Sequence, residues 1–361
     1  MKGRIPFGVY SLLSLACGLA VLAGVPAPVP AAPQTSAEIA AYRGADRQAV
    51  LEAGARKEGS VLVYGTGTQM EPVRNAFRQK YPFIRLEVFS DGAPQVTRKL
   101  LEEYKASRFT VDVLSLSTGG LHILREAGLL QPYTSPELDR IRKEAIQPDG
   151  LWALTYENYV GLGYNTKEIK GSDVPRTYDD LLDPKWKGKM AIADSGSTFE
   201  NWIGGVVLTK GEAFLRSLKA QNFPVFKIGG RGFSNLVVSG EQPISPAIYS
   251  SHMANSKSAG ASVAWRALGP SYALIDAVAL PAKPAHPHGA MLYIDFVLSI
   301  QAQKMVQEMG YASARTDLEN AEKPERILYL TERPNYAAEY EHWSKLKVEV
   351  FGKATPLAEP K

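Results

Sequence analysis

The first half of the chain alternates short apolar runs with amphipathic stretches. A short apolar run between polar or Gly/Pro positions is typical of a buried strand, whereas apolar positions three or four residues apart predict a helix. This pattern predicts strands at 61–64, 85–89 and 111–114 and helices at 46–57, 72–81, 94–104 and 120–127. Strands that alternate with helices predict an α/β fold in which helices flank the sheet.

The second half repeats this organisation after a long extended segment. Residues 152–164 are rich in aromatic and β-branched side chains and predict extended crossing strands. A strand at 189–193 leads into Asp194-Ser195-Gly196-Ser197-Thr198 and then a helix, so a second α/β set covers roughly 160–270. A further apolar run lies at 273–280, and one continuous helix is expected from about 288 to 309.

The N-terminus has the pattern of a secretory signal peptide. Lys2 and Arg4 precede an apolar run from about Ile5 to Val25, and Val29-Pro30-Ala31 supplies a small-residue exit, so residues 1–31 are predicted to be removed. One alternative is a lipoprotein acylated at Cys17. The other is a retained membrane anchor, which the prolines at the end of the run disfavour. We expect an exported, periplasmic protein.

Charge and cysteine content exclude several classes of function. The chain of 361 residues has 41 basic and 37 acidic residues; without residues 1–31 the balance is 39 − 37 = +2. This balance gives no indication of a nucleic-acid partner, which would need a clustered basic surface. Cys17 is the only cysteine, so the processed chain would contain no disulfide and no thiolate chemistry.

Six segments of the chain match one pattern of motifs. The most specific is Tyr178-Asp-Asp-Leu-Leu-Asp-Pro-Lys-Trp-Lys-Gly-Lys189. The others are Leu62-Val-Tyr-Gly65, Ala127-Gly-Leu-Leu-Gln-Pro132, Gly161-Leu-Gly-Tyr-Asn165, Ser239-Gly-Glu-Gln-Pro243 and Ile294-Asp-Phe-Val-Leu-Ser299. In these segments, which occur in the family's order, the chain resembles the solute-binding proteins of ABC importers, and among them the ferric-iron-binding branch of the type 2 periplasmic fold.

The resemblance implies an α/β protein of two lobes, each a mixed sheet flanked by helices. Lobe 1 would contain 38–155 plus 274–361, and lobe 2 would contain 156–273. Two crossing strands, near 154–159 and 271–275, would form the hinge. A ligand in such a fold lies between the lobes, in line with the tendency of α/β sheets to bind at the carboxyl ends of their strands.

The chain departs from the family at the ferric site. Iron-binding members hold the metal with adjacent tyrosines, helped by a His and a Glu. Here the tyrosine pair falls at Tyr249 and Ser250-Ser251, the His position falls on Thr68, and the Glu position lies near Ser117. Ferric iron is a hard cation that prefers several anionic oxygens. The usual ferric site is therefore expected to be absent, with Tyr249 and His252 as the ligands if iron is bound.

An anion site of the family has a counterpart in this chain. The resemblance places an anion at the Ser195-Gly196-Ser197 turn, where the free N–H groups and dipole of the following helix favour negative charge. Arg231 is a candidate for a bidentate pair with a carboxylate or phosphate. The remaining ligand-binding candidates come from loops and strand ends expected to line the same cleft and are Thr66, Thr68, Ser117, Thr118, Tyr156, Tyr249 and Ser250. Helix capping, a surface arginine and core tyrosines remain open alternatives.

Nothing in the sequence indicates catalysis. The turn at Ser195 lacks the Gly-x-Ser-x-Gly elbow, Gly65-Thr66-Gly67 is too short for a dinucleotide fingerprint, and no His motif suggests a catalytic metal. We expect a protein without enzymatic activity, catalytic residues or a cofactor.

The sequence thus predicts the periplasmic solute-binding component of an ABC importer, capturing a small oxyanionic organic ligand. One alternative is a protein that binds ferric iron or an iron chelate. The other is a receptor that docks on a membrane histidine kinase instead of a permease. In each case the partners are a small molecule and a membrane protein, with no nucleic acid, and a monomer is expected.

Overall fold

The computed structural model describes residues 1, 3, 33–65, 70–194, 197–320 and 323–356. Apart from residues 1 and 3, the predicted signal peptide at 1–31 lies outside these ranges. The chain divides into Met1–Ala32 and one compact unit, Pro33–Lys361, which is the part discussed below. Among the described residues, none of the helices has the length and apolar character needed to cross a membrane.

The main sheet begins with three parallel strands and continues with two long antiparallel ones. The strand order is β2-β1-β3-β10-β5-β8, with β4 and β11 beside β10 and β9 beside β5. The strands of this sheet are β1 (Ser60–Gly65), β2 (Arg85–Ser90), β3 (Val113–Leu116), β4 (Leu130–Gln131), β5 (Trp152–Asn165), β8 (Ile244–Tyr249), β9 (Val263–Arg266), β10 (Ser271–Pro281) and β11 (Ile327–Leu328). The predicted mixed α/β fold is confirmed.

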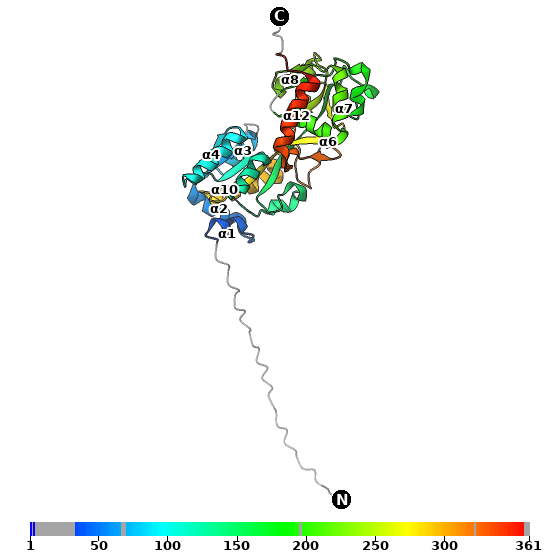
Figure 1. Ribbon diagram of the computed structural model, residues 1–361. Coiled ribbons are helices and arrows are strands. Elements are labelled where there is room, and N and C mark those ends of the chain that lie inside the picture. The colour runs from blue at the N-terminus through cyan, green and yellow to red at the C-terminus, as the bar shows by residue number, and fades with distance from the viewer. Residues whose placement is uncertain (2, 4–32, 66–69, 195–196, 321–322, 357–361) are drawn as a thin grey trace. The chain divides into compact units, whose positions relative to one another are not determined.

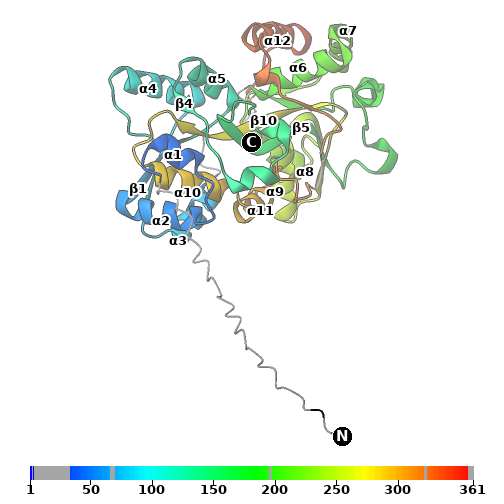
Figure 2. The ribbon, with the colours of Figure 1, turned by 90° about the horizontal axis from the view of Figure 1, so that it is seen from below.

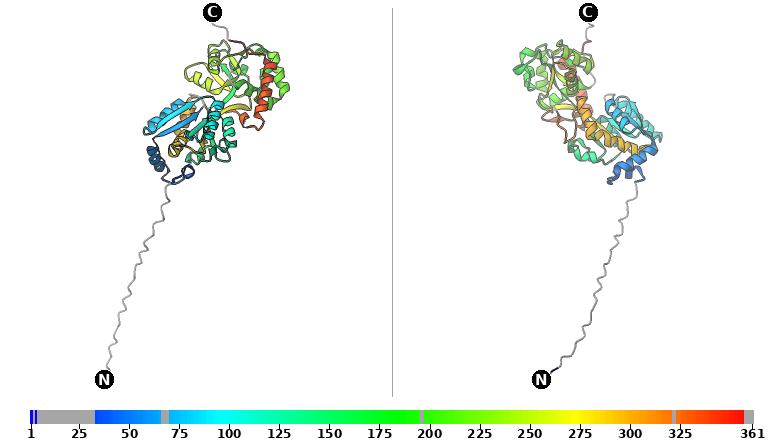
Figure 3. Two further views of the ribbon diagram at one scale, coloured as in Figure 1. Left: turned by 60° about the vertical axis from the view of Figure 1, so that its left-hand side comes forward. Right: turned by 180° about the vertical axis from the view of Figure 1, so that it is seen from behind.

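Helices cover the parallel part of the sheet because their apolar residues recur on one side. In α3, for example, Val73 and Phe77 are buried, and a proline stands in its first turn. Figures 2 and 3 show α10 beside α2. The helices of this part are α1 (Ser36–Ala41), α2 (Arg47–Glu58), α3 (Glu71–Lys80), α4 (Ala93–Lys105), α5 (Thr118–Glu126), α10 (Pro287–Leu298) and α11 (Ile300–Glu308).

The single helix predicted over 288–309 is wrong. Ser299 has extended backbone angles, φ −64° and ψ 156°, so α10 ends there and α11 begins immediately afterwards. Its hydroxyl accepts a hydrogen bond from the backbone N–H of Ala302, which caps α11. The periodic apolar pattern continues through the break, which is why the pattern alone did not reveal it.

A second group of elements surrounds the C-terminal half of β5. It contains the short strands β6 (Ile192–Ala193) and β7 (Val225–Phe226), which pair in parallel. Its helices are α6 (Thr198–Lys210), α7 (Glu212–Ser217), α8 (Gly230–Ser239), α9 (Ser250–Ser258) and the C-terminal α12 (Tyr336–Phe351). Short 3₁₀ turns at 136–140, 143–145, 171–173, 179–182, 184–186, 218–221 and 330–332 complete the connections.

β5 and β10 run through both hydrophobic cores of the protein. They pair antiparallel, with Tyr159 opposite Ala273 and a register shift at Asp276. On β5, Tyr159 packs in the larger core and Val160 in the smaller one. On β10, Ala273 packs in the larger core, whereas Tyr272 and Leu274 pack in or against the smaller one. These two strands are therefore the shared elements that the predicted hinge requires.

The exact lobe boundaries stay a prediction, and core packing adds two differences. The larger core also includes Phe233 and Trp265, which the prediction assigned to lobe 2. The smaller core includes Trp343 and Leu346 of α12, which the prediction assigned to lobe 1. Figure 1 shows α12 (red) lying along α6. Trp343 packs over Gly204, where a Cβ atom would come within 2.7 Å of its ring.

Candidate functional site

A cavity of about 240 Å³ lies where strand ends meet helix starts in the second group of elements. β6 and β8 end at it, and α6, α8 and α9 begin at it. None of these three helices has a side-chain hydrogen bond at its N-cap, which favours an anion at their N-termini, although in α9 the N–H of Ser251 already donates to the side-chain oxygen of Asn158 at 3.2 Å. We call it the Tyr249 cavity; it is lined by Ala193, Thr198, Gly230, Arg231, Phe233, Ala247, Ile248, Tyr249 and His252.

Tyr249 presents its phenol at the end of β8. Its hydroxyl accepts a hydrogen bond of 2.9 Å from the hydroxyl of Thr198, the first residue of α6. Burial raises the pKa of Tyr249 to about 12, and the Thr198 hydrogen bond opposes this rise. The side chain is therefore a neutral phenol at pH 7, and only a strong Lewis acid such as a ferric ion would convert it to phenolate.

His252 lies edge-on to Tyr249, with ring centroids 5.6 Å apart. Burial, helped by the positive charge of Arg231, lowers the pKa of His252 to about 4. Its Nδ1 is buried and has no hydrogen-bond partner among the described residues. A neutral imidazole with an unused ring nitrogen is suited to bind a metal or to hydrogen-bond a ligand.

Gly230 makes room for this imidazole. A Cβ atom at position 230 would lie 2.6 Å from Cε1 of His252. Arg231, the next residue, is exposed and forms no ion pair with any described residue. Since the described lining contains no carboxylate, the cavity combines positive charge with neutral polar groups.

The structure brings only part of the predicted ligand site together. Arg231, Tyr249 and His252 line the Tyr249 cavity, and Ser197 is the N-cap of α6 at its edge. Thr66, Thr68, Ser195 and Gly196 lie outside the described residues. A ligand-binding role for each of these remains a prediction.

Three other candidates lie elsewhere. Ser117 is the N-cap of α5, and the hydroxyl of buried Thr118 is 3.2 Å from that of Thr331 beside a separate cavity of about 50 Å³. Tyr156 is buried, with its ring 4.6 Å from that of Tyr311. None of the three lines the Tyr249 cavity.

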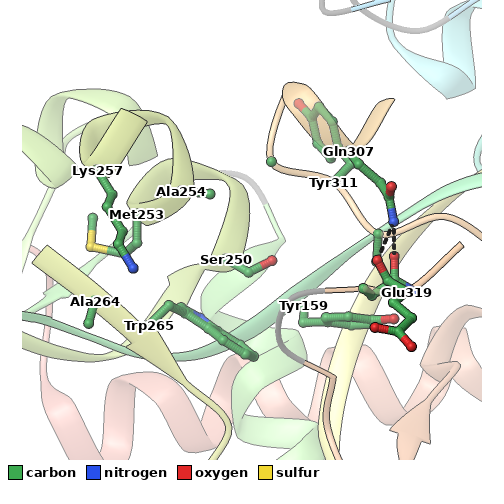
Figure 4. Close-up of a pocket in the computed structure, with 13 residues that line it drawn as sticks. Tyr159, Ser250, Met253, Ala254, Lys257, Ala264, Trp265, Gln307, Tyr311 and Glu319 are labelled. Carbon is green, nitrogen blue, oxygen red and sulfur yellow. Dashed lines mark hydrogen bonds between the residues drawn. The ribbon is translucent and has the colours of Figure 1, made fainter. Parts of the chain in front are cut away.

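Ser250 faces a different and larger cavity of about 360 Å³ on the other side of α9 (Figure 4). Its lining is largely apolar, and its polar groups are mostly paired within the protein. Trp265 Nε1 donates to the Ile248 carbonyl at 3.0 Å, and the Tyr159 hydroxyl donates to Glu157 at 2.7 Å. We call it the Trp265 cavity; it is lined by Tyr159, Ser250, Met253, Ala254, Lys257, Ala264, Trp265, Gln307, Gly310, Tyr311, Ala312, Glu319 and Asn320.

Sequence reasoning missed Thr198 as the partner of Tyr249 and Gly230 as the residue that admits His252. The Gly229-Gly230 pair beside Arg231 was the available signal for the second. In the described ranges, no group of three or more His, Cys, Asp or Glu side chains is arranged to hold a metal ion. Among the described residues, a metal at the Tyr249 cavity would have Tyr249 and His252 as ligands and would need further ligands from elsewhere.

Comparison with known proteins gives sequence relatives that match part of the chain and solved structures that match about four fifths of it. The Fe(3+)-binding periplasmic protein of Serratia marcescens is 25% identical over 148 residues, which cover 40% of this chain and 43% of that protein. Iron uptake protein A2 of Synechocystis is 35% identical over 92 residues, a quarter of each chain. These alignments therefore span less than half the length of the relatives.

Among solved structures, iron-bound HitA from Pseudomonas aeruginosa matches with a TM-score of 0.65 and 22% identity, covering 81% of this chain and 99% of that one. The periplasmic binding protein AfuA from Actinobacillus pleuropneumoniae, solved with exogenous fructose-6-phosphate bound, matches with a TM-score of 0.59 and 21% identity, covering 82% and 100%. These likenesses confirm the predicted fold, that of the two-lobed periplasmic binding proteins.

Residues 111–333, more than half of the chain, match the profile of a single family. This match agrees with the six segments that carried the resemblance, with the mixed sheet that contains β5 and β10, and with the structural likeness over about four fifths of the chain. The chain belongs to the family of bacterial extracellular solute-binding proteins.

Proposed function

We propose that this protein is the periplasmic ligand-capturing component of an ABC importer, and that its cargo is ferric iron held by an anionic chelator. The observation that carries the proposal is the placement of Tyr249 and His252 in one cavity with Arg231 and three helix N-termini. The names of the partial sequence relatives, which refer to iron, favour an iron cargo over the purely organic anion expected from the sequence.

The charge of the cavity favours a chelate over the bare ion. A phenolate and an imidazole are two ligands, whereas ferric iron prefers several oxygens. Arg231 and the helix N-termini would repel a bare trivalent cation and attract the carboxylates of a chelator. In a ferric chelate, Tyr249 and His252 would contact the iron while Arg231 and the helix N–H groups contact the chelator.

The test is a titration of the purified protein with ferric citrate, followed by calorimetry and by visible absorption. We expect a phenolate-to-iron band in the wild type. In Tyr249→Phe the band should disappear and affinity should fall by about 100-fold, roughly 2.7 kcal/mol. Tyr340→Phe is the matched control, because Tyr340 is a partly buried tyrosine on α12 that does not line the cavity.

An iron-free organic oxyanion is the second candidate. It is favoured by Ser250, which stands where the second tyrosine of the iron-binding family would be, and by the open helix N-termini. Tight binding of fructose 6-phosphate or citrate without iron, lost in Arg231→Ala and unchanged in Tyr249→Phe, would establish it. Binding of ferric citrate with no visible band would likewise reject coordination by Tyr249.

A further inference from the structure

Lys347, on the C-terminal helix, reaches two carboxylates that flank the start of α6. Its Nζ lies 2.8 Å from Asp194 and 2.5 Å from Glu200. Asp194 directly follows Ala193, and Glu200 lies two residues after Thr198, and both Ala193 and Thr198 line the Tyr249 cavity. Lys347 therefore forms ion pairs before and after the first residue of α6, with partners 153 and 147 positions away in the sequence.

Glu200 and Lys347 are buried enough for their ion pair to affect stability. The side chain of Glu200 is 6% exposed and that of Lys347 is 15% exposed. Burial lowers the pKa of Lys347, but its hydrogen bonds to Asp194 and Glu200 outweigh this and leave the pKa raised. The lysine therefore stays charged at neutral pH. The second oxygen of Glu200 has no hydrogen-bond partner among the described residues, so Lys347 is its main compensation.

Further contacts attach α12 to the same part of α6. The Tyr336 hydroxyl donates to the side-chain oxygen of Asn201 at 3.2 Å. Trp343 packs over Gly204 one turn later. Beyond α12, Thr355 continues the pairing of β7 through the backbone of Val225. The C-terminal segment therefore contacts α6, which begins at the cavity, and β7, which pairs with the strand β6 that ends there.

We propose that Lys347 is a positioning residue for the Tyr249 cavity. By neutralising part of the negative charge of Asp194 and Glu200, it allows an anionic ligand to bind at the start of α6. With the lysine, the group of Lys347, Asp194 and Glu200 carries one net negative charge; without it, the group carries two. Both carboxylates lie within the first turn of α6 or just before it, where they compete with a bound anion for the positive end of the helix. This inference rests on the proposed function, because it requires an anionic ligand or chelate.

The test compares affinities for two probes, ferric citrate and fructose 6-phosphate, by titration calorimetry. Lys347→Met keeps the aliphatic stem and removes the charge; we expect about tenfold weaker binding of whichever probe the wild type binds, which corresponds to about 1.4 kcal/mol. Asp194→Asn in the Lys347→Met background should restore affinity to within about threefold, since it returns the net charge to its original value. Lys345→Met is the matched control, because Lys345 is an exposed lysine of the same helix paired with Glu341.

The rescue separates charge from packing. If Lys347 acts only by stabilising α12, Asp194→Asn should not restore binding, and that result would overturn the inference. Unchanged affinity in Lys347→Met would overturn it as well. If the wild type binds neither probe, the proposed function fails and this inference falls with it. Binding by the wild type with no effect of Lys347→Met leaves the proposed function standing and rejects only the role of Lys347.

Discussion

Two cavities lie on opposite sides of the short helix α9, and they differ in how many of their polar groups lack a partner within the protein. The smaller one has His252 on its wall, with an unused ring nitrogen, beside Arg231 and helix N-termini without side-chain caps. The larger one has Met253 and Ala254 on its wall, and Trp265 and Tyr159 have their polar atoms paired within the protein. Between these two, size alone would select the larger cavity as the ligand site.

The difference shows that available hydrogen-bonding and coordinating groups, and not volume, distinguish the candidate site. Burying polar groups without partners is costly unless a ligand or water satisfies them. The Tyr249 cavity retains that cost, whereas in the Trp265 cavity the indole and the phenol are already satisfied. The predictions below change one cavity at a time.

The largest expected effect is on stability, from the Trp265 cavity. Trp265 is 6% exposed and packs over Gly161, where a Cβ atom would come within 2.6 Å of the indole. Trp265→Ala should lower the free energy of unfolding by about 3–5 kcal/mol, measured by denaturant titration. Ligand affinity of the remaining folded protein should change less than about threefold. If Trp265→Ala kept full stability but no longer bound the ligand, the Trp265 cavity and not the Tyr249 cavity would be the ligand site.

Filling the smaller cavity should abolish binding while filling the larger one should not. Gly230→Leu forces His252 out of place, so we expect at least about 100-fold loss of affinity, about 2.7 kcal/mol. Ala264→Leu adds similar bulk to the Trp265 cavity and serves as the control. Equal losses in the two variants, measured by calorimetry, would mean that a single ligand site extends across both cavities.

His252 should make stability depend on pH. Its pKa falls from 6.5 in the unfolded chain to about 4 in the fold, so its contribution is fully present above pH 6.5 and is lost as pH falls toward 4. Wild type should lose on the order of 2 kcal/mol more than His252→Gln over this interval, allowing for the partial exposure of the ring. Parallel pH profiles of the two proteins, from urea unfolding, would contradict a buried neutral imidazole.

The smallest effect is expected at Ser250. Its hydroxyl is 3.3 Å from the side-chain oxygen of Asn158 and faces the Trp265 cavity. Ser250→Ala should change ligand affinity by less than about threefold, roughly 0.6 kcal/mol. A tenfold loss in the same titration would restore Ser250 to the ligand site, as expected from the sequence.

The sequence predicted much of the fold because its elements are locally encoded. The strands at 61–64 and 85–89 and the helix at 72–81 lie within a residue or two of β1, β2 and α3. Tyr249 and His252 were also accessible, since they are three residues apart at the start of one helix. The pairing of Lys347 with Asp194 was not, because no local pattern links residues so distant in the chain. Which cavity Ser250 lines depends on how α9 is rotated about its axis. Hydrophobic periodicity does not fix that rotation when the helix packs against protein on both sides.

The contribution of α12 to the smaller core has a consequence for how the protein is made. Trp343, Leu346 and Val350 belong to that core, and they come from the last part of the chain. Because a chain emerges from the ribosome N-terminus first, this core must stay incomplete until α12 has been synthesised. Until then its apolar surface is exposed and can bind chaperones. Loss of the last turns of α12 would therefore lower the folding yield as well as remove Lys347.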